Sequence, residues 1–129
     1  MKKIAFIVWN YTVTGGIERV LTNLANELCD YYDVHIISLT KSEDRVPYKI
    51  DERVNRVYFA TDEPLRGREV IKKGGKGVRR YIKDNGIDTV LLMGFQSSMP
   101  AIAMLKFRSR TRLIFCEHEA LMSRWHEKK

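Results

Sequence analysis

Two short segments carry the residue types best suited to hold or transform a small ligand. The first is Thr14-Gly15-Gly16, between an apolar run and an amphipathic segment. Glycine lets the backbone approach a ligand, and a helix N-terminus offers free N–H groups to an anion. Neither the G-x-G-x-x-G dinucleotide fingerprint nor the Gly-Lys-Ser/Thr end of a P-loop is present. A tight turn that simply needs glycine is an equally good interpretation, since Glu18 already complements the helix dipole.

The second segment is centred on His118, which Glu117 and Glu119 flank directly after another apolar run. An imidazole there can hydrogen-bond a substrate hydroxyl or move a proton, and a neighbouring carboxylate raises its pKa and fixes its tautomer. The alternative is a surface histidine with incidental acidic neighbours. No second ligand pair has metal-type spacing, so we expect neither a metal nor a cofactor. His35 lies inside an apolar run and is expected to be a packed residue.

Two further groups of polar residues are candidates for binding. Gln96 and Ser97 precede a short predicted helix, where they could orient a sugar or phosphate, although helix capping explains the serine without a ligand. Residues 66–83 hold eight basic side chains and one acid, Glu69. On an amphipathic helix such residues would coat the outer face, either as a solvated surface or against anionic lipid headgroups. The basic candidates for a membrane-facing surface are Lys72, Lys73, Lys76, Arg79, Arg80 and Lys83.

The elements that must position these residues alternate along the chain. Apolar runs predict strands over residues 3–9, 33–39, 54–60, 88–93 and 112–116, and helical periodicity predicts helices over 17–29, 67–85 and about 98–107. This alternation predicts an α/β fold, a Rossmann-like doubly wound parallel sheet with helices on both faces. Ligands of such sheets bind beyond the carboxyl ends of the strands. We therefore expect the glycine turn and His118 to open onto the same crevice.

Within the helices, two details are open to test. The period of the first helix places Glu18 mostly with the polar residues of the outer face. The second contains Gly74, Gly75 and Gly77, which are poor helix formers, and a kink, a mobile segment or close backbone packing each explain them.

Composition limits the class of protein. The chain has 129 residues, 44% hydrophobic, which suits one slightly short domain with a real core. No apolar run approaches the roughly 18 residues of a membrane span, and the apolar stretch after Lys3 is too short for a signal peptide, so a cytoplasmic protein is expected. Cys29 and Cys116 are expected to be reduced core thiols. The net charge of +7 suits a polyanionic partner or a merely soluble protein, and nucleic acid is disfavoured because aromatics do not interleave the basic residues.

Two blocks resemble a known family. Residues 15–21 (GGIERVL) followed by 24–28 (LANEL) are similar to the opening of family 4 glycosyltransferases, and 117–119 (EHE) stands where that family places a histidine beside an acidic residue. The resemblance implies a retaining, two-domain GT-B enzyme that uses a nucleotide-sugar donor. It implies that this chain is the acceptor-side N-terminal domain, residues 1–129, and that the nucleotide-sugar domain lies outside it.

The resemblance also implies roles for the candidate residues. Gly15 and Gly16 would line the cleft facing the donor phosphates, and His118 would contact the acceptor or the transferred sugar. The acceptor side would include Thr14, Gln96, Ser97 and Glu119. We expect a glycan or lipid-linked acceptor of the cell envelope, peripheral membrane contact and no transfer by this chain alone. Self-association is expected through an unpaired strand edge or an apolar patch. The alternative is a non-catalytic Rossmann-like module that binds a phosphorylated ligand or a protein partner.

Overall fold

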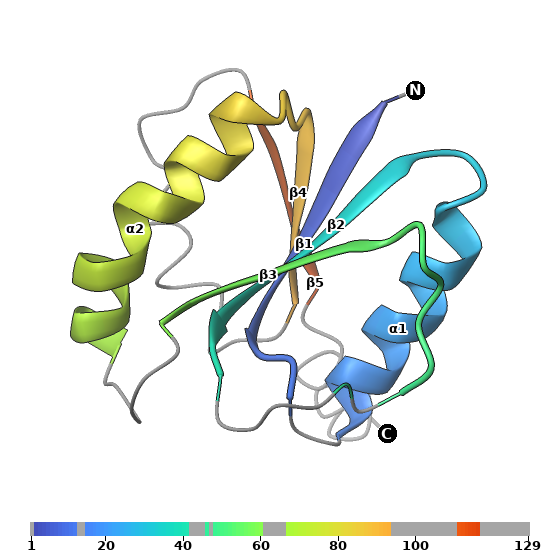
Figure 1. The fold of residues 1–129 in the computed structure, drawn as a ribbon, viewed down its shortest axis with the longest axis horizontal. Helices are drawn as coiled ribbons and strands as arrows, with labels where there is room; N and C mark the ends of the chain where they lie inside the picture. The colour runs from blue at the N-terminus through green and yellow to red at the C-terminus, as the bar shows by residue number, and fades with distance from the viewer. Residues whose placement is uncertain are drawn as a thin grey trace, which may run out of the picture.

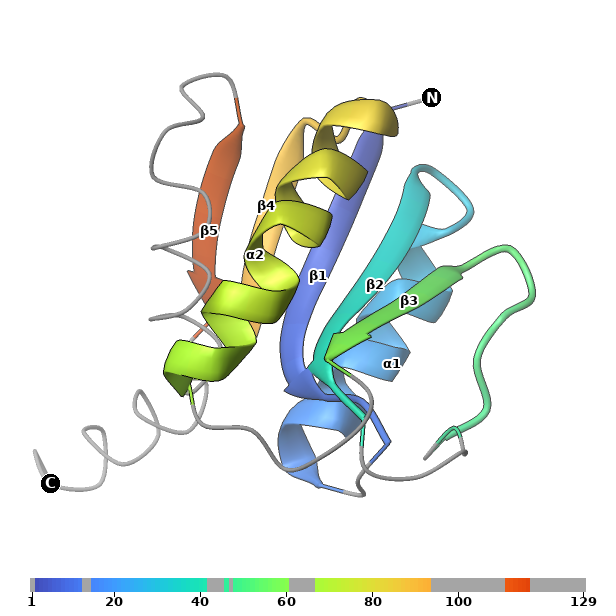
Figure 2. The same cartoon turned by 60° about the vertical axis from the view of Figure 1, so that its left-hand side comes forward.

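The computed structural model describes residues 2–12, 15–41, 46, 48–60, 67–93 and 111–116. In these residues the strands β1 (Lys3–Asn10), β2 (Asp33–Thr40), β3 (Asn55–Ala60), β4 (Thr89–Met93) and β5 (Arg112–Cys116) form one sheet in the order β3-β2-β1-β4-β5. Every pairing is parallel. The arrowheads in Figure 2 accordingly meet at one edge of the sheet. The strand ranges agree with the predicted ones to within one residue.

Helices lie on both faces of this sheet. Helix α1 (Gly16–Leu28) joins β1 to β2, and α2 (Gly67–Asp84) joins β3 to β4. The connection from β1 to β2 crosses the sheet in one direction, and the connection from β3 to β4 crosses it in the other. Since both crossovers are right-handed, α1 and α2 lie on opposite faces. Figure 1 shows α1 and α2 on the two sides of the sheet. The predicted Rossmann-like doubly wound sheet is therefore confirmed.

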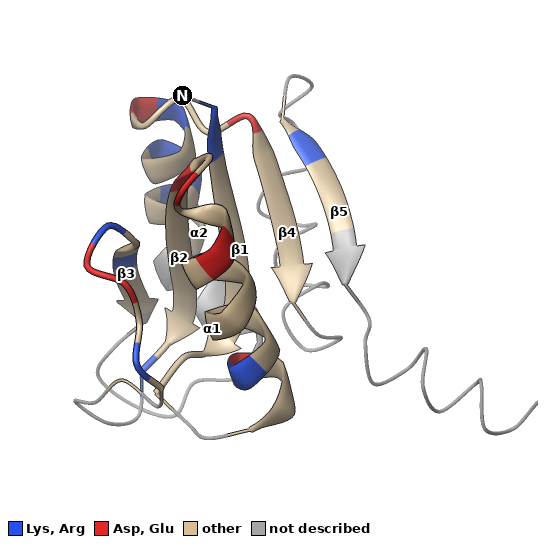
Figure 3. Cartoon of the chain, turned by 90° about the vertical axis from the view of Figure 1, so that its right-hand side faces the viewer, with Lys and Arg blue, Asp and Glu red and all other residues tan. Residues whose placement is uncertain are grey.

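The apolar strands divide their side chains between two cores. Phe6 and Val8 of β1 pack with Leu21 of α1, whereas Ala5 and Ile7 of the same strand pack on the α2 side. These side chains are between 0 and 2% exposed. Full burial of a large apolar side chain is worth about 1.5–3 kcal/mol. Burial on both faces explains why β1 is an almost continuous apolar run. Figure 3 shows that the central strands are largely free of charged residues.

Helix α2 is continuous through Gly74, Gly75 and Gly77. A Cβ on Gly77 would lie 2.8 Å from two ring carbons of Phe59 on β3. Close packing, one of the three explanations for the glycines, is therefore the reason at this position. The helix ends at Asp84, and Gly86, the predicted stop, follows it with a φ of 63° that favours glycine. The amide of Ile87 donates to the carbonyl of Ile82 (3.0 Å), which completes a Schellman-type cap.

The predictions for His35 and Cys29 are confirmed. His35 is 3% exposed, with Nδ1 2.6 Å from the Tyr81 hydroxyl and Nε2 3.2 Å from Asp33. It therefore fastens α2 to β2. Cys29 is a free, buried thiol, and burial raises its pKa. The side chain of Cys116 lies outside the described part of the structure.

Candidate functional site

The order of strands locates the candidate site. The sheet grows outward through β2 and β3 on one side of β1, and through β4 and β5 on the other. The direction therefore reverses between β1 and β4, and ligands of open α/β sheets bind beyond the carboxyl ends at this switch point. The segment that leaves β1 there is the one that contains the glycines. It enters α1 at the same edge of the sheet (Figure 2).

Buried hydrogen bonds anchor the chain as it leaves β1. Tyr11 is fully buried, and its amide donates to the Ser38 hydroxyl on β2 (3.0 Å). Its own hydroxyl is 2.5 Å from that of Thr22 on α1. Since the Thr22 hydroxyl donates its proton to the Glu18 carbonyl (2.7 Å), Tyr11 is the donor between the two hydroxyls. Burial raises the pKa of Tyr11, which stays neutral and can keep donating. Tyr11 thus ties β1, β2 and α1 together below the glycine turn.

Two more contacts shape the same edge. Asn10 accepts hydrogen bonds at Oδ1 from the amide (2.9 Å) and hydroxyl (2.5 Å) of Thr12, which is fully buried. This side-chain turn mimics a backbone turn. At the end of β2, the Thr40 hydroxyl donates to the Trp9 carbonyl (2.7 Å). The end of β1 is therefore held by its own side chains and by β2 before the chain reaches Gly15.

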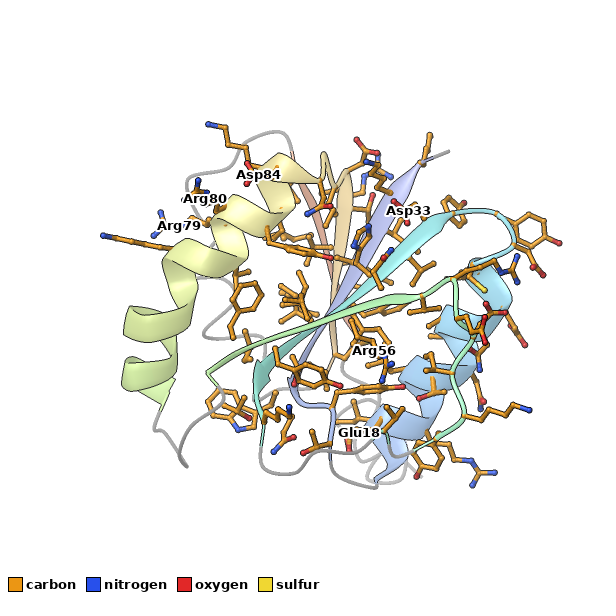
Figure 4. All side chains as sticks on the ribbon, in the orientation of Figure 1. Glu18, Asp33, Arg56, Arg79, Arg80 and Asp84 are labelled. Carbon is orange, nitrogen blue, oxygen red and sulfur yellow. The ribbon has the colours of Figure 1, made fainter. Side chains whose placement is uncertain are left out.

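Gly15 is the N-cap of α1, and its environment corrects one expectation. Its backbone is extended (φ −167°, ψ 175°), which any residue adopts, so a left-handed conformation does not require glycine here. The constraint is steric: a Cβ would lie 2.6 Å from Oε1 of Glu18. Glu18 is only 9% exposed, so its assignment to the outer face was wrong. In the first turn its side chain folds back over the N-cap, where the helix dipole stabilises the carboxylate (Figure 4).

At Gly16, unlike Gly15, a side chain would have free space among the described residues. Gly16 is exposed, and no atom of the described residues lies within 4 Å of the position that a Cβ would occupy. Its φ is not positive, so the backbone does not demand glycine either. Among the described residues, the first turn of α1 is thus covered by Glu18 on the Gly15 side and open on the Gly16 side. An open helix N-terminus is a candidate place for an anion.

The other predicted site residues lie outside the described part of the chain, namely Thr14, Gln96, Ser97, His118 and Glu119. The backbone register still relates the two ends of the candidate crevice. Ile7 of β1 pairs with Leu92 of β4, which pairs with Phe115 of β5. The carboxyl ends of β1 and β5 are thus two strand spacings apart, about 10 Å, at the same edge.

The basic residues of α2 are only partly on the outer face. Lys76, Arg80 and Lys83 are exposed, and Arg80 pairs loosely with Asp84 (3.6 Å, Figure 4). Arg79 corrects the expectation, because it is half-buried and its buried Nε has no hydrogen-bond partner among the described residues. The side chains of Lys72 and Lys73 lie outside the described part. Within the residues described, no helix combines the length and apolar character needed to cross a bilayer.

Sequence reasoning missed the residues that support the turn: Tyr11, Thr22, Ser38 and Thr40. Ser38 and Thr40 are buried hydroxyls near the carboxyl end of a strand that is buried along most of its length. Buried polar groups are normally hydrogen-bonded, so a hydroxyl at the carboxyl end of a strand buried on both faces is a usable signal. The Ser38 hydroxyl accepts from Tyr11 and donates to the Thr40 carbonyl (2.6 Å).

The parallel sheet, helices α1 and α2 and the glycine turn at the switch point define a Rossmann-like α/β domain. The family profile described as Glycosyltransferase Family 4 matches residues 14–129. The chain therefore belongs to glycosyltransferase family 4.

Individual proteins agree with this assignment. An uncharacterized glycosyltransferase of Haemophilus influenzae is 32% identical over 94 residues, which cover 72% of this chain and 26% of that protein. Sucrose-phosphate synthase from Thermosynechococcus elongatus has a TM-score of 0.72 at 13% identity, covering 98% of this chain and 35% of that one. The apo form of the lipopolysaccharide outer core galactosyltransferase WaaB has a TM-score of 0.65 at 17% identity, covering 90% and 33%. The structural likeness concerns the fold. This chain spans about a quarter to a third of these proteins.

Proposed function

We propose that this chain is the acceptor-side N-terminal domain, residues 1–129, of a retaining glycosyltransferase whose nucleotide-sugar domain lies outside it. The observation that carries the proposal is the open first turn of α1 at Gly16, located at the switch point of the sheet in a family 4 chain. The complete enzyme would transfer a sugar from a nucleotide-sugar donor to a glycan or lipid-linked acceptor of the cell envelope. The chain by itself would not transfer sugar.

The reaction explains why the turn would face the donor. Transfer breaks the bond between the sugar and the nucleoside diphosphate, and the departing diphosphate gains negative charge. Unpaired N–H groups and the positive end of the α1 dipole stabilise such charge. Glu18 occupies the Gly15 side of the turn, so the diphosphate would approach from the open side, at Gly16.

The remaining candidates would act on the acceptor. His118 would contact the acceptor or the transferred sugar near the reacting centre, where it can hydrogen-bond a hydroxyl or move its proton. The parallel register supports this role, because β5 ends at the same edge as β1. Residues proposed to bind the acceptor are Thr14, Gln96, Ser97 and Glu119.

The test is turnover of nucleotide sugars by the complete enzyme and by His118→Ala. Loss of a group that takes part in proton transfer should lower kcat by about 100-fold or more. Thermal unfolding of the variant serves as the control for folding. Unchanged turnover would remove His118 from the site, and turnover by this chain alone would contradict the proposed division between two domains. If the reading frame stops after Lys129, a non-catalytic module that binds a phosphorylated ligand or partner is favoured instead.

A second proposal concerns the location of the enzyme: cytoplasmic, with α2 resting on an anionic membrane surface. Lys76, Arg80 and Lys83 are exposed on the helix, with only Asp84 paired to one of them among the described residues. Each basic side chain near an anionic surface contributes about 1 kcal/mol, so three together should strengthen binding by roughly 100-fold. Such contact would bring the domain to a lipid-linked acceptor.

Vesicle co-sedimentation tests this second proposal. The chain should bind phosphatidylcholine vesicles that contain phosphatidylglycerol, and bind vesicles of phosphatidylcholine alone far more weakly. Replacing Lys76, Arg80 and Lys83 together by glutamate should abolish the difference. Arg19→Glu, at an exposed basic residue on α1, is the matched control and should change little. Equal binding to both kinds of vesicle would rule out the electrostatic contact.

A further inference from the structure

The connection between β2 and β3 is fastened along α1. We call residues 48–54 the strap. Its backbone is bound by Asn26 of α1, whose side chain donates to the Lys49 carbonyl (3.0 Å) and accepts from the Asp51 amide (2.7 Å). Val54 is 6% exposed at the end of the strap and joins the core on the α1 side. The strap thus runs beside α1 from its first turn toward its C-terminal end (Figure 1).

The far end of the strap is held by an ionic contact. Arg53 donates to Asp30, in the turn after α1, at 2.7 Å, and to Asp51 at 3.0 Å. The side-chain and backbone hydrogen bonds that Arg53 donates to Asp51 hold the pKa of the Asp51 carboxyl below its usual range. Arg53 and Asp30 are more than half exposed, so this pair is of modest strength. The strap therefore depends mainly on Asn26 and on its apolar residues, and its position relative to α1 is well defined.

The near end of the strap reaches the glycine turn. The Tyr48 hydroxyl donates to the Gly15 carbonyl at 3.2 Å, and the same carbonyl accepts the first helical hydrogen bond, from the Arg19 amide, at 3.1 Å. A carbonyl oxygen has two lone pairs, so both bonds can form together. Gly15 is thereby held through its carbonyl by Tyr48, while the Glu18 carboxylate lies against its Cα.

We propose that Tyr48 is a positioning residue: it fixes the Gly15 peptide so that the open side of the turn at Gly16 keeps the orientation in which it receives the donor diphosphate. The inference rests on the proposed function. Tyr48 does not need to touch the donor. Without its hydroxyl, the turn would still form through Arg19 and Tyr11, but the N-cap peptide would open more often. The consequence should be weaker donor binding with little change in the chemical step.

The structural part of the proposal can be tested on this chain without any activity. Amide hydrogen exchange is measured for Tyr48→Phe, and the Arg19 amide should exchange about fivefold faster, the effect of losing one ordinary hydrogen bond. The Leu24 amide, in the middle of α1, should be unchanged. Tyr31→Phe is the matched control, because Tyr31 is 72% exposed at the other end of α1. If exchange at Arg19 is unchanged in Tyr48→Phe, Tyr48 does not hold the turn and the proposal is wrong.

The functional part uses the complete enzyme. Tyr48→Phe should raise the KM for the nucleotide sugar by about fivefold at nearly constant kcat, again the loss of one hydrogen bond. Asn26→Ala separates positioning from stability, since it removes two contacts of the strap and should lower the melting temperature more while changing the donor KM less. If the rise in donor KM in Tyr48→Phe and Asn26→Ala simply followed the loss of melting temperature in each variant, a positioning role for Tyr48 would be refuted.

The two arms distinguish the possible failures. A wild-type enzyme that turns over no nucleotide sugar would contradict the proposed function, while the exchange experiment would still decide whether Tyr48 holds Gly15. Faster exchange at Arg19 with an unchanged donor KM in an active enzyme would show that the turn does not receive the donor, and would overturn the inference.

Discussion

Replacing Gly16 by alanine separates the two reasons for which a helix can begin with glycine. Where glycine serves the fold, alanine destabilises the protein. Where glycine leaves room for a ligand, alanine is harmless to the fold and harmful to binding. At Gly16 a Cβ meets no described atom within 4 Å, and φ is not positive. We therefore expect alanine to stabilise this chain and to weaken donor binding by the complete enzyme.

The magnitude follows from conformational entropy. Alanine in place of glycine in a helix gains about 0.5–1 kcal/mol when the site is unstrained and open. For a chain of this size such a gain raises the melting temperature by roughly 2–5 °C. In the complete enzyme the added methyl group would occupy the space at the open side of the turn. A misplaced methyl in a binding site is worth about 1–3 kcal/mol, so the donor KM should rise by about fivefold or more.

Gly15→Ala is the matched comparison one residue away. Its Cβ would lie 2.6 Å from Oε1 of Glu18, so the carboxylate must move, and we expect a net destabilisation of about 1 kcal/mol. In the background of Glu18→Ala the same substitution should become neutral or stabilising, because the obstructing atom is gone. This double-mutant cycle identifies the Glu18 carboxylate as the cause.

Urea unfolding followed by circular dichroism measures all of these changes, with the slope m checked for constancy. If Gly16→Ala destabilised the chain, the inference that a Cβ at residue 16 has free space would be wrong, since other atoms would then cover the turn in solution. The reasoning would be refuted for the site if Gly16→Ala stabilised the chain and left the donor KM of the complete enzyme unchanged.

Three further outcomes are expected. Gly77→Ala should destabilise the chain by about 1 kcal/mol in urea unfolding, because overpacking against the Phe59 ring at 2.8 Å exceeds the gain of about 1 kcal/mol in helix propensity; a stabilised variant would contradict the close packing. Tyr81→Phe should destabilise by about 1–3 kcal/mol, since it leaves buried Nδ1 of His35 without the hydroxyl, and an unchanged midpoint would refute that contact. Burial raises the pKa values of Tyr11 and Tyr81, so the native state keeps protons that the unfolded chain loses at alkaline pH. The contribution of these tyrosines to the free energy of unfolding is therefore complete below about pH 10 and is lost as the pH rises further. Urea midpoints at pH 9 and pH 11 check the alkaline loss, and a midpoint that does not fall would contradict the sign.

Much of the fold was predictable because its signals are local. An apolar run such as residues 3–9 is typical of a strand that is buried on both faces. Strands separated by helical segments favour parallel pairing. Gly86 follows the last turn of α2, and its positive φ is a property of that residue and its immediate neighbours. The two family blocks, residues 15–21 and 24–28, are also local, so the sequence alone carries the resemblance.

The candidate site was predictable only in outline. The switch-point rule selected the carboxyl edge between β1 and β4, and hence the turn at Gly15 and Gly16 as the candidate site. It did not reveal that Glu18 would fold back over Gly15, because helical periodicity assigns a first-turn residue to a face without considering the free N–H groups nearby. Nor did it reveal Tyr48, whose partner is 33 residues earlier in the chain.

The amino-acid sequence by itself determined the alternation of strands and helices, the edge of the sheet that carries the candidate site, and membership of a glycosyltransferase family. The tertiary structure alone decided which side of the turn Glu18 covers, why Gly77 must be small, and that His35 hydrogen-bonds Tyr81, 46 residues away. The physical reason is range. Propensity and periodicity act over one or two helical turns, whereas steric room and buried hydrogen bonds depend on residues that only the folded chain brings together.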